Sequence, residues 1–209
     1  AEGYSIDGIS LNVNLGDRFG IFGPNGAGKT TLISILCGIL PYKIGNVQYR
    51  INKRIVEFKE IKKSIGLIPQ DLALYDELTA FQNLEYFGAL NNMSSQEIRN
   101  YSIDLLDVFG LKSVLPKKVK TFSGGMKRRL NLAIGVINKP RILFLDEPTV
   151  GVDVQSKNAI LSFLNKINDE GTTIIYTSHH LEEAEKLCSR IAILDYGKLV
   201  ALDKTKDLL

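Results

Sequence analysis

The sequence predicts an α/β fold in which a mainly parallel sheet is covered by helices and an all-helical lobe is inserted. Short apolar segments alternate with longer helical patterns, as in parallel sheets that are buried on both faces. The stretch from Thr79 to about Ile137 breaks this alternation, because it is helical and contains no convincing strand. With 209 residues, 44% of them hydrophobic, the chain is long enough to bury such a core.

Individual elements follow from local patterns. The segments expected as buried strands are Phe19–Phe22, Ile65–Pro69, Ile142–Leu145, Thr173–Thr177 and Ile191–Leu194. The last continues through a turn at 195–198 into a hairpin partner at 199–201. A capping box at 94–97 begins a helix that runs to Phe109 and stops at Gly110. We expect one domain over residues 1–209, with a core at about 1–78 and 138–209 and a helical subdomain at about 79–137.

Composition and charge narrow the class of function. A net charge of +3 is too small to indicate a nucleic-acid partner. The most basic stretches, Lys117–Lys120 and Lys127–Arg129, are interpreted as a solvated helix face or loop rather than an anion or lipid contact. Cys37 and Cys188 lie far apart in apolar patterns, which predicts buried thiols in a reducing compartment. Without a secretory signal or an apolar run near the roughly 18 residues of a membrane span, we expect a cytoplasmic protein.

A complete phosphate-binding loop at 23–30 matches the pattern G-x-x-x-x-G-K-[ST], between an expected strand and an expected helix. Its glycines let backbone N–H groups turn inward around phosphate oxygens, and the positive end of the helix adds to the attraction. Lys29 can reach the β- and γ-phosphates, and the Thr30 hydroxyl can bind Mg²⁺. We expect a P-loop NTPase core that binds a nucleoside triphosphate. The residues assigned to its phosphate site are Gly23, Pro24, Asn25, Gly26, Ala27, Gly28, Lys29, Thr30 and Thr31.

Two acidic residues, Asp146 and Glu147, follow the expected strand Ile142–Leu145. They are expected at the carboxyl end of a parallel strand, where ligands bind in such sheets. Asp146 can hold Mg²⁺ through water, and Glu147 can polarise the water that attacks the γ-phosphate. Alone, this pair would indicate only an acidic turn, so the functional interpretation depends on the phosphate loop. The next helix is expected to begin after Asp153 and to end at Gly171.

A second anion site is predicted at Ser123-Gly124-Gly125, ahead of a helix expected over Lys127–Ile137. Ser123 can cap this helix, and the two glycines expose backbone N–H groups at its positive end. One triphosphate cannot use both loops within a single compact domain. We therefore expect a head-to-tail dimer in which these three residues of each protomer meet the γ-phosphate that the other protomer holds.

With these motifs, nearly the whole chain resembles the nucleotide-binding domain of the ATP-binding cassette (ABC) family. The resemblance implies that Ser123-Gly124-Gly125 is the signature loop, that Asp146 is the metal-binding acid, and that Glu147 is the catalytic glutamate. It implies that Gln70 touches Mg²⁺ and the attacking water and reports nucleotide state to the membrane partner. The implied metal-binding residues are thus Thr30, Gln70 and Asp146.

The resemblance also implies a loop across the dimer and a switch histidine. Asp153, in Gly151-Val152-Asp153, matches the loop that reaches the partner. His179 matches the histidine that contacts the γ-phosphate, and its rival His180 is interpreted as a solvated residue at a helix start. Met126 departs from the glutamine of many members. Tyr4 is the nearest candidate for the aromatic residue that stacks on adenine, although a surface tyrosine is the simpler interpretation.

Three stretches are similar to the drug- and antibiotic-exporter branch, namely 123–130, 146–153 and 179–185. The resemblance implies the ATPase subunit of an exporter that uses ATP and Mg²⁺. Its implied partners are a second copy or a related cassette and a permease on a separate chain, which would hold it at the inner face of the cell membrane. The apolar segment at 72–75 either contacts that permease or packs within the lobe. One alternative is a soluble cassette that remodels a ribosome or DNA. Another, a regulatory module with little turnover, is disfavoured by Glu147 and His179.

Overall fold

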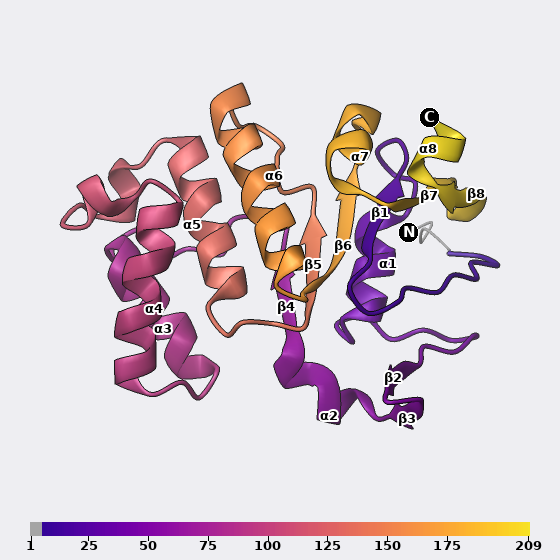
Figure 1. The fold of residues 1–209 in the computed structure, drawn as a ribbon, viewed down its shortest axis with the longest axis horizontal. Helices are drawn as coiled ribbons and strands as arrows, with labels where there is room; N and C mark the ends of the chain where they lie inside the picture. The colour runs from indigo at the N-terminus through magenta and orange to yellow at the C-terminus, as the bar shows by residue number, and fades with distance from the viewer. Residues whose placement is uncertain (1–5) are drawn as a thin grey trace.

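The computed structural model describes residues 6–209, so Tyr4 lies outside the described residues. Six strands form one sheet in the order β4-β5-β6-β1-β7-β8 (Figure 1), and its last strand alone is antiparallel to its neighbour. These strands are β1 (Arg18–Phe22), β4 (Ile65–Ile68), β5 (Ile142–Asp146), β6 (Thr173–Ser178), β7 (Arg190–Asp195) and β8 (Lys198–Lys204). The mainly parallel α/β fold is therefore confirmed.

Both faces of the sheet are buried, because alternate side chains of each central strand point to opposite cores. On β5, Leu143 and Leu145 join the core formed with α6 and α7, whereas Phe144 joins the core formed with α1. On β6, Ile174 joins the core formed with α6 and α7, and Ile175 joins the core formed with α1. The helices that cover the sheet or extend its edge are α1 (Lys29–Leu36), α6 (Val154–Asp169), α7 (Leu181–Leu187) and α8 (Thr205–Leu208).

An all-helical segment connects β4 to β5 and lies beside β4 (Figure 1). Its helices are α3 (Ala80–Leu90), α4 (Ser95–Val108) and α5 (Gly124–Val136), with short 3₁₀ turns at Lys112–Val114 and Val119–Thr121. Capping boxes begin the first two helices, with Thr79 and Ser94 accepting hydrogen bonds from the backbone N–H of Gln82 and Glu97. Within residues 6–209, no helix has the length and apolar composition needed to cross a membrane.

Local differences from the sequence predictions have simple causes. Strand β4 ends at Ile68, one residue before Pro69, which has no N–H to donate to the sheet. The start predicted for α5 at Lys127 is wrong, because Gly124 and Gly125 already form its first turn. Both cysteines are buried as predicted, and burial raises the pKa of each thiol to about 12.

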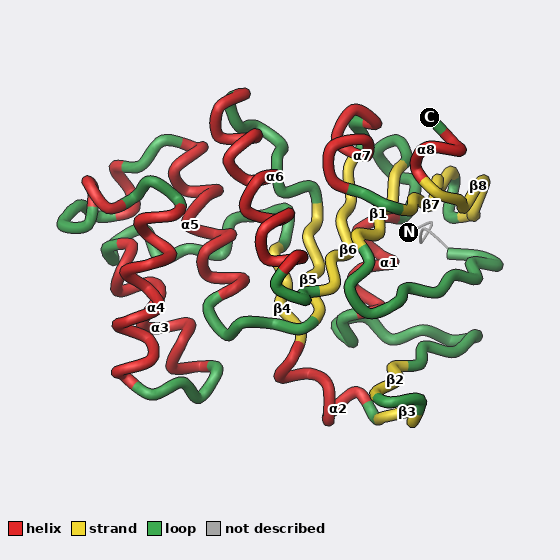
Figure 2. The backbone as a smooth tube through the Cα atoms, viewed as in Figure 1, coloured by secondary structure: helices red, strands yellow, loops and turns green. Residues whose placement is uncertain are grey.

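A small hairpin that was not predicted from the sequence is formed by β2 (Tyr49–Ile51) and β3 (Arg54–Val56). Each strand has three residues, too few to show alternation. Its turn residues, Asn52 and Lys53, both have positive φ, as a two-residue type I′ turn requires, but without the glycine that usually marks it. Figure 2 shows the hairpin away from the main sheet, followed by α2 (Phe58–Ile61) and a 3₁₀ turn at Lys62–Ser64 that lead into β4.

Close backbone packing joins the helical segment to the sheet. A Cβ atom on Gly66 would lie 2.5 Å from the carbonyl oxygen of Gly135, and a Cβ on Gly135 would overlap the Ile68 side chain. Strand β4 and helix α5 can approach this closely because both contact residues are glycines.

Gly135→Ala should therefore lower the free energy of unfolding by about 1–3 kcal/mol through overpacking against Ile68. In an Ile68→Ala background the overlapping atoms are gone, and the same change should be neutral or stabilising by up to about 1 kcal/mol, because alanine favours a helix over glycine. Urea unfolding of the parent, both single variants and the double variant measures this coupling. An equal cost in both backgrounds would contradict the packing argument.

Candidate nucleotide-binding site

The loop at 23–30 connects the carboxyl end of β1 to the start of α1. Gly23 has φ 154°, and a Cβ there would overlap the carbonyl oxygen of Leu194, so only glycine fits. Gly28 caps α1 in the left-handed conformation, and no acidic residue occupies the first turn of the helix. The helix therefore presents an unneutralised positive end to this loop, as a phosphate site needs.

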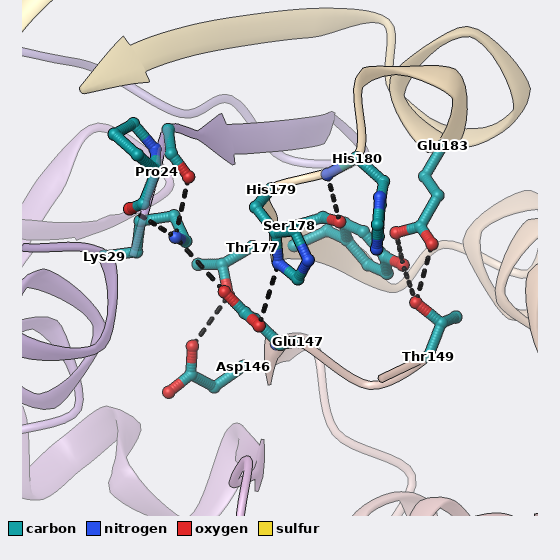
Figure 3. Close-up of polar contacts among 12 residues, drawn as sticks. Pro24, Lys29, Asp146, Glu147, Thr149, Thr177, Ser178, His179, His180 and Glu183 are labelled. Atoms are coloured by element: carbon teal, nitrogen blue, oxygen red, sulfur yellow. Dashed lines mark hydrogen bonds and ion pairs between the residues drawn. The ribbon is translucent and has the colours of Figure 1, made fainter. Parts of the chain in front are cut away.

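The Lys29 ammonium lies over this loop and is buried, with 4% of the residue exposed. Its Nζ donates hydrogen bonds to the carbonyl oxygens of Gly23 at 2.8 Å and Pro24 at 3.0 Å. It also forms an ion pair with Glu147 Oε1 at 3.1 Å. Figure 3 shows these contacts, with the ammonium between the loop and the acid. Two carbonyl oxygens and one carboxylate of the protein thus satisfy the positive charge.

The hydroxyl group of Thr177 links the end of β5 to the end of β6 through hydrogen bonds. Thr177 Oγ1 donates to Asp146 Oδ1 at 2.7 Å and accepts from the Glu147 backbone N–H at 3.0 Å. Asp146 and Thr177 are direct partners in the parallel pairing of these strands. Glu147 has φ 47°, a conformation that is uncommon outside glycine and that aims its side chain toward the phosphate loop. No sequence pattern indicates this role of Thr177, which follows only from the register of the two strands.

Of the two neighbouring histidines, the structure brings His179 into the site. Its Nδ1 lies 3.2 Å from Glu147 Oε2, so the carboxylate lies between Lys29 and His179 (Figure 3). His180 occupies the N-cap position of α7 without a side-chain capping bond and is exposed, as His179 is. The centroids of the two rings are 3.9 Å apart. Its backbone N–H donates to Ser178 Oγ at 3.0 Å.

The three candidate metal ligands, Thr30, Gln70 and Asp146, differ in how far they are buried. Asp146 is buried, whereas Thr30 and Gln70 are exposed. In the described part of the chain, Gln70 joins the cluster through its carbonyl oxygen, which accepts from Arg128 Nη1 at 2.7 Å. The described residues contain no group of three or more His, Cys, Asp or Glu side chains suited to a metal. The available hydroxyl, carboxylate and amide oxygens nevertheless fit Mg²⁺, which binds few protein oxygens and takes others from water and phosphate.

The residues expected to form the signature loop, Ser123-Gly124-Gly125, lie at the start of α5, on the other side of α6 from α1 in Figure 1. Ser123 Oγ accepts from the Met126 backbone N–H at 3.3 Å, and a Cβ on Gly124 would meet no atom within 4 Å. A Cβ on Gly125 would lie 3.2 Å from Asp153 Oδ2 of the same chain. Asp153 caps α6, and hydrogen bonds from the Ser156 N–H and hydroxyl hold its pKa below the usual value. This second candidate anion site, Ser123-Gly124-Gly125, is therefore open to solvent.

A buried polar network not identified from the sequence lies behind the site. The Glu183 carboxylate, 1% exposed, accepts from Tyr176 at 2.6 Å and from Thr149 at 2.8 Å, and pairs with Lys157 at 2.7 Å. Burial alone raises the pKa of Glu183, but hydrogen bonds from Lys157, Tyr176 and other neighbours outweigh it and lower the pKa. The network connects the segment after Glu147 to the helix after His180.

The interpretation of 127–129 as a solvated face or loop is wrong for its central residue. Arg128 is buried, with 4% exposed, and donates to the main-chain carbonyls of Gln70 and Glu147. Helical spacing was the available signal, because Arg128 lies four and eight residues before the buried Leu132 and Val136. In contrast, Lys127 lies nearer the surface and pairs with Asp76 at 2.8 Å.

Comparison with known proteins identifies the family. A sequence model described as ABC transporter matches residues 6–150. The linearmycin resistance ATP-binding protein LnrL of Bacillus subtilis (strain 168) is 43% identical over 97% of this chain and 65% of its own length. The daunorubicin resistance ATP-binding protein DrrA3 of Streptomyces coeruleorubidus is 39% identical over 94% of this chain and 62% of its own length. The Nod factor export ATP-binding protein I of Rhizobium sp. (strain N33) is 39% identical over 94% of this chain and 64% of its own length.

Solved structures of similar fold belong to the same family as these relatives. An ATP-binding subunit of an ABC transporter superposes with a TM-score of 0.83 and 28% identity, over 95% of this chain and 82% of that one. A dimeric ATP-binding cassette in a post-hydrolysis state, bound to ADP and Pi, superposes with a TM-score of 0.80 and 26% identity. The match covers 93% of this chain and 88% of that one. The chain spans less than two-thirds of the length of the curated relatives described above. On this evidence the chain belongs to the ABC transporter family, and its relatives include ATP-binding proteins of antibiotic resistance, as the resemblance implied.

Proposed function

We propose that this chain binds and hydrolyses ATP as the ATP-binding subunit of an exporter, powering transport through a separate membrane permease. The observation that carries the proposal is the position of Glu147, whose carboxylate lies 3.1 Å from Lys29 and 3.2 Å from His179. A buried carboxylate between a phosphate-binding ammonium and an imidazole can act on water beside a γ-phosphate. Names of the relatives, which refer to drug resistance and Nod factor export, support an exporter over a cassette that remodels a ribosome or DNA.

In the proposed reaction, the γ-phosphate replaces Glu147 as the partner of Lys29. The released carboxylate then orients the attacking water and accepts its proton, while His179 contacts the γ-phosphate. The water oxygen bonds to the γ-phosphorus as the bond from that phosphorus to the β–γ bridging oxygen breaks, so that ADP leaves with the bridging oxygen and phosphate is released. Mg²⁺, held by Thr30, Asp146 and Gln70 together with water, would neutralise charge on the phosphates. During this reaction, the hydrogen bonds of Thr177 hold the side chain of Asp146 and the main chain of Glu147 in position.

The proposed active form is a head-to-tail dimer with a second copy or a related cassette. Support comes from the open cradle at Ser123-Gly124-Gly125 and from exposed loop residues 24–26, which leave each anion site free to meet a partner. A similar solved cassette is dimeric. Asp153, beside Gly125, would lie in the same interface and reach the partner. We expect residues 79–137 to move as a helical subdomain when the dimer closes.

The proposed permease contact uses apolar residues that follow Gln70. Leu72, Tyr75 and Tyr86 are each more than 40% exposed, and the ring centroids of the two tyrosines are 4.8 Å apart. Such a contact would hold the chain at the cytoplasmic face of the cell membrane. Nucleic acid is not expected as a partner, because Lys118 and Lys120 pair with Glu77 rather than forming a free basic patch.

Glu147→Gln should separate ATP binding from hydrolysis. The amide keeps the shape of the side chain but loses the base, so turnover should fall at least about a hundredfold. ATP affinity should hold or rise, since a neutral amide competes less with phosphate for Lys29. Size-exclusion chromatography with ATP should then show a trapped dimer. Glu182→Gln, on the exposed start of α7, is the matched control and should leave turnover unchanged. A Glu147→Gln protein that stays monomeric at high ATP would count against the dimer.

Mixing two inactive variants should restore activity if the sites are shared between protomers. Lys29→Ala removes the phosphate-binding ammonium, and Gly124→Asp places a carboxylate against the partner's γ-phosphate, which costs several kcal/mol at an effective dielectric near 20. A mixed dimer has one site with both lesions and one with neither. ATPase activity of the mixture should exceed that of either variant alone. If mixing restores nothing while unaltered protomers dimerise, the two loops do not meet across the interface.

A further inference from the structure

Arg128 is a buried arginine in the part of the helical segment nearest the site. It lies on the first turns of α5, three residues after Gly125, and 4% of it is exposed. A buried guanidinium is costly unless its donors are all satisfied, so its partners indicate what it is for.

Five main-chain carbonyl groups surround this guanidinium, two after β4 and three at the end of β5. Nη1 donates to Gln70 at 2.7 Å and to Pro69 at 3.2 Å. Nη2 donates to Asp146 at 3.2 Å and to Glu147, and Nε donates to Pro148 at 2.6 Å. Because a guanidinium has five N–H donors, its hydrogen-bonding capacity is fully used.

The charge of Arg128 also suits this position. Burial lowers its pKa, and the nearby carboxylates of Asp146 and Glu147 oppose that shift. Lysine could not take this place, because one ammonium has three donors and lacks the planar fork that reaches two separate chain segments.

The next residue along the helix provides a contrast. Arg129 Nη1 donates to the Phe109 carbonyl at 2.8 Å and its Nε to that of Gly125 at 3.4 Å. Both partners belong to the helical segment itself. Arg129 therefore holds this segment together, whereas Arg128 joins it to the ends of two sheet strands.

We propose that Arg128 is a positioning residue for hydrolysis. It fixes the main chains of Gln70 and Glu147 relative to each other and to the helix that begins with Ser123-Gly124-Gly125. A shift of α5 thus moves the attacking-water residues and the signature loop together. This inference rests on the proposed function, because it assigns Arg128 an effect on the step that Glu147 performs.

The test compares Arg128→Lys with Arg129→Lys in the whole protein, by steady-state ATPase kinetics and by hydrogen–deuterium exchange. For Arg128→Lys, kcat should fall at least about tenfold, since small misplacements of reacting groups are costly. KM and nucleotide binding should stay within about threefold, because the phosphate loop is untouched. Amides near Gln70 and Glu147 should exchange faster while those at 23–30 do not change. Arg129→Lys should lower the thermal midpoint but keep kcat within about threefold.

Several results would overturn the proposal. These are an Arg128→Lys protein with kcat near that of the parent, an equal kcat loss in Arg129→Lys, or faster exchange spread evenly over the chain. If Arg128→Lys does not fold, Arg128→Gln is measured in the same way, and failure of both shows a folding role instead. An unaltered protein without ATPase activity would refute the proposed function, whereas the exchange pattern still decides whether Arg128 positions both segments.

Discussion

Parallel pairing of four neighbouring strands, β4, β5, β6 and β1, is the constraint on which the site depends. It brings the carboxyl ends of these strands to one edge, so that segments far apart in the sequence become neighbours. Asp146 pairs with Thr177, and Phe22 pairs with Ser178, which places the phosphate loop, the two acids and His179 side by side. Each polar contact of the site then needs only a short reach from the end of a strand.

The buried charges within the site balance one another. Two buried cations, Lys29 and Arg128, lie near two buried carboxylates, Asp146 and Glu147. Each charge is paired with or hydrogen-bonded to another group of the protein, which offsets the cost of its burial. In the proposed reaction, an incoming triphosphate would disturb this balance by competing with one carboxylate for one ammonium, so Glu147 would be the group that responds to nucleotide.

Motifs and strand ends were predictable from sequence, because local residue order encodes them. The loop around Lys29, the acids at the carboxyl end of β5 and the cap at Ser94 need only neighbouring residues to be recognised. Arg128 and the Glu183 network were not predicted, because their partners come from segments that only the folded chain brings together. The β2–β3 hairpin was missed for a different reason, since three-residue strands carry too little periodicity. Preference for His179 over His180 came from the family resemblance, and strand β6 places it beside Glu147.

The way the helical segment is attached limits how it can move. The chain leaves the sheet at the carboxyl end of β4 and returns at the amino end of the adjacent parallel strand β5, so the two attachments lie at opposite ends of one strand pair. A body tethered at two points along a line turns about that line more easily than it slides along it. The axis of such a turn runs parallel to β4 and β5. If the segment swings about it, Ser123 at the start of α5 moves sideways while neither strand has to stretch.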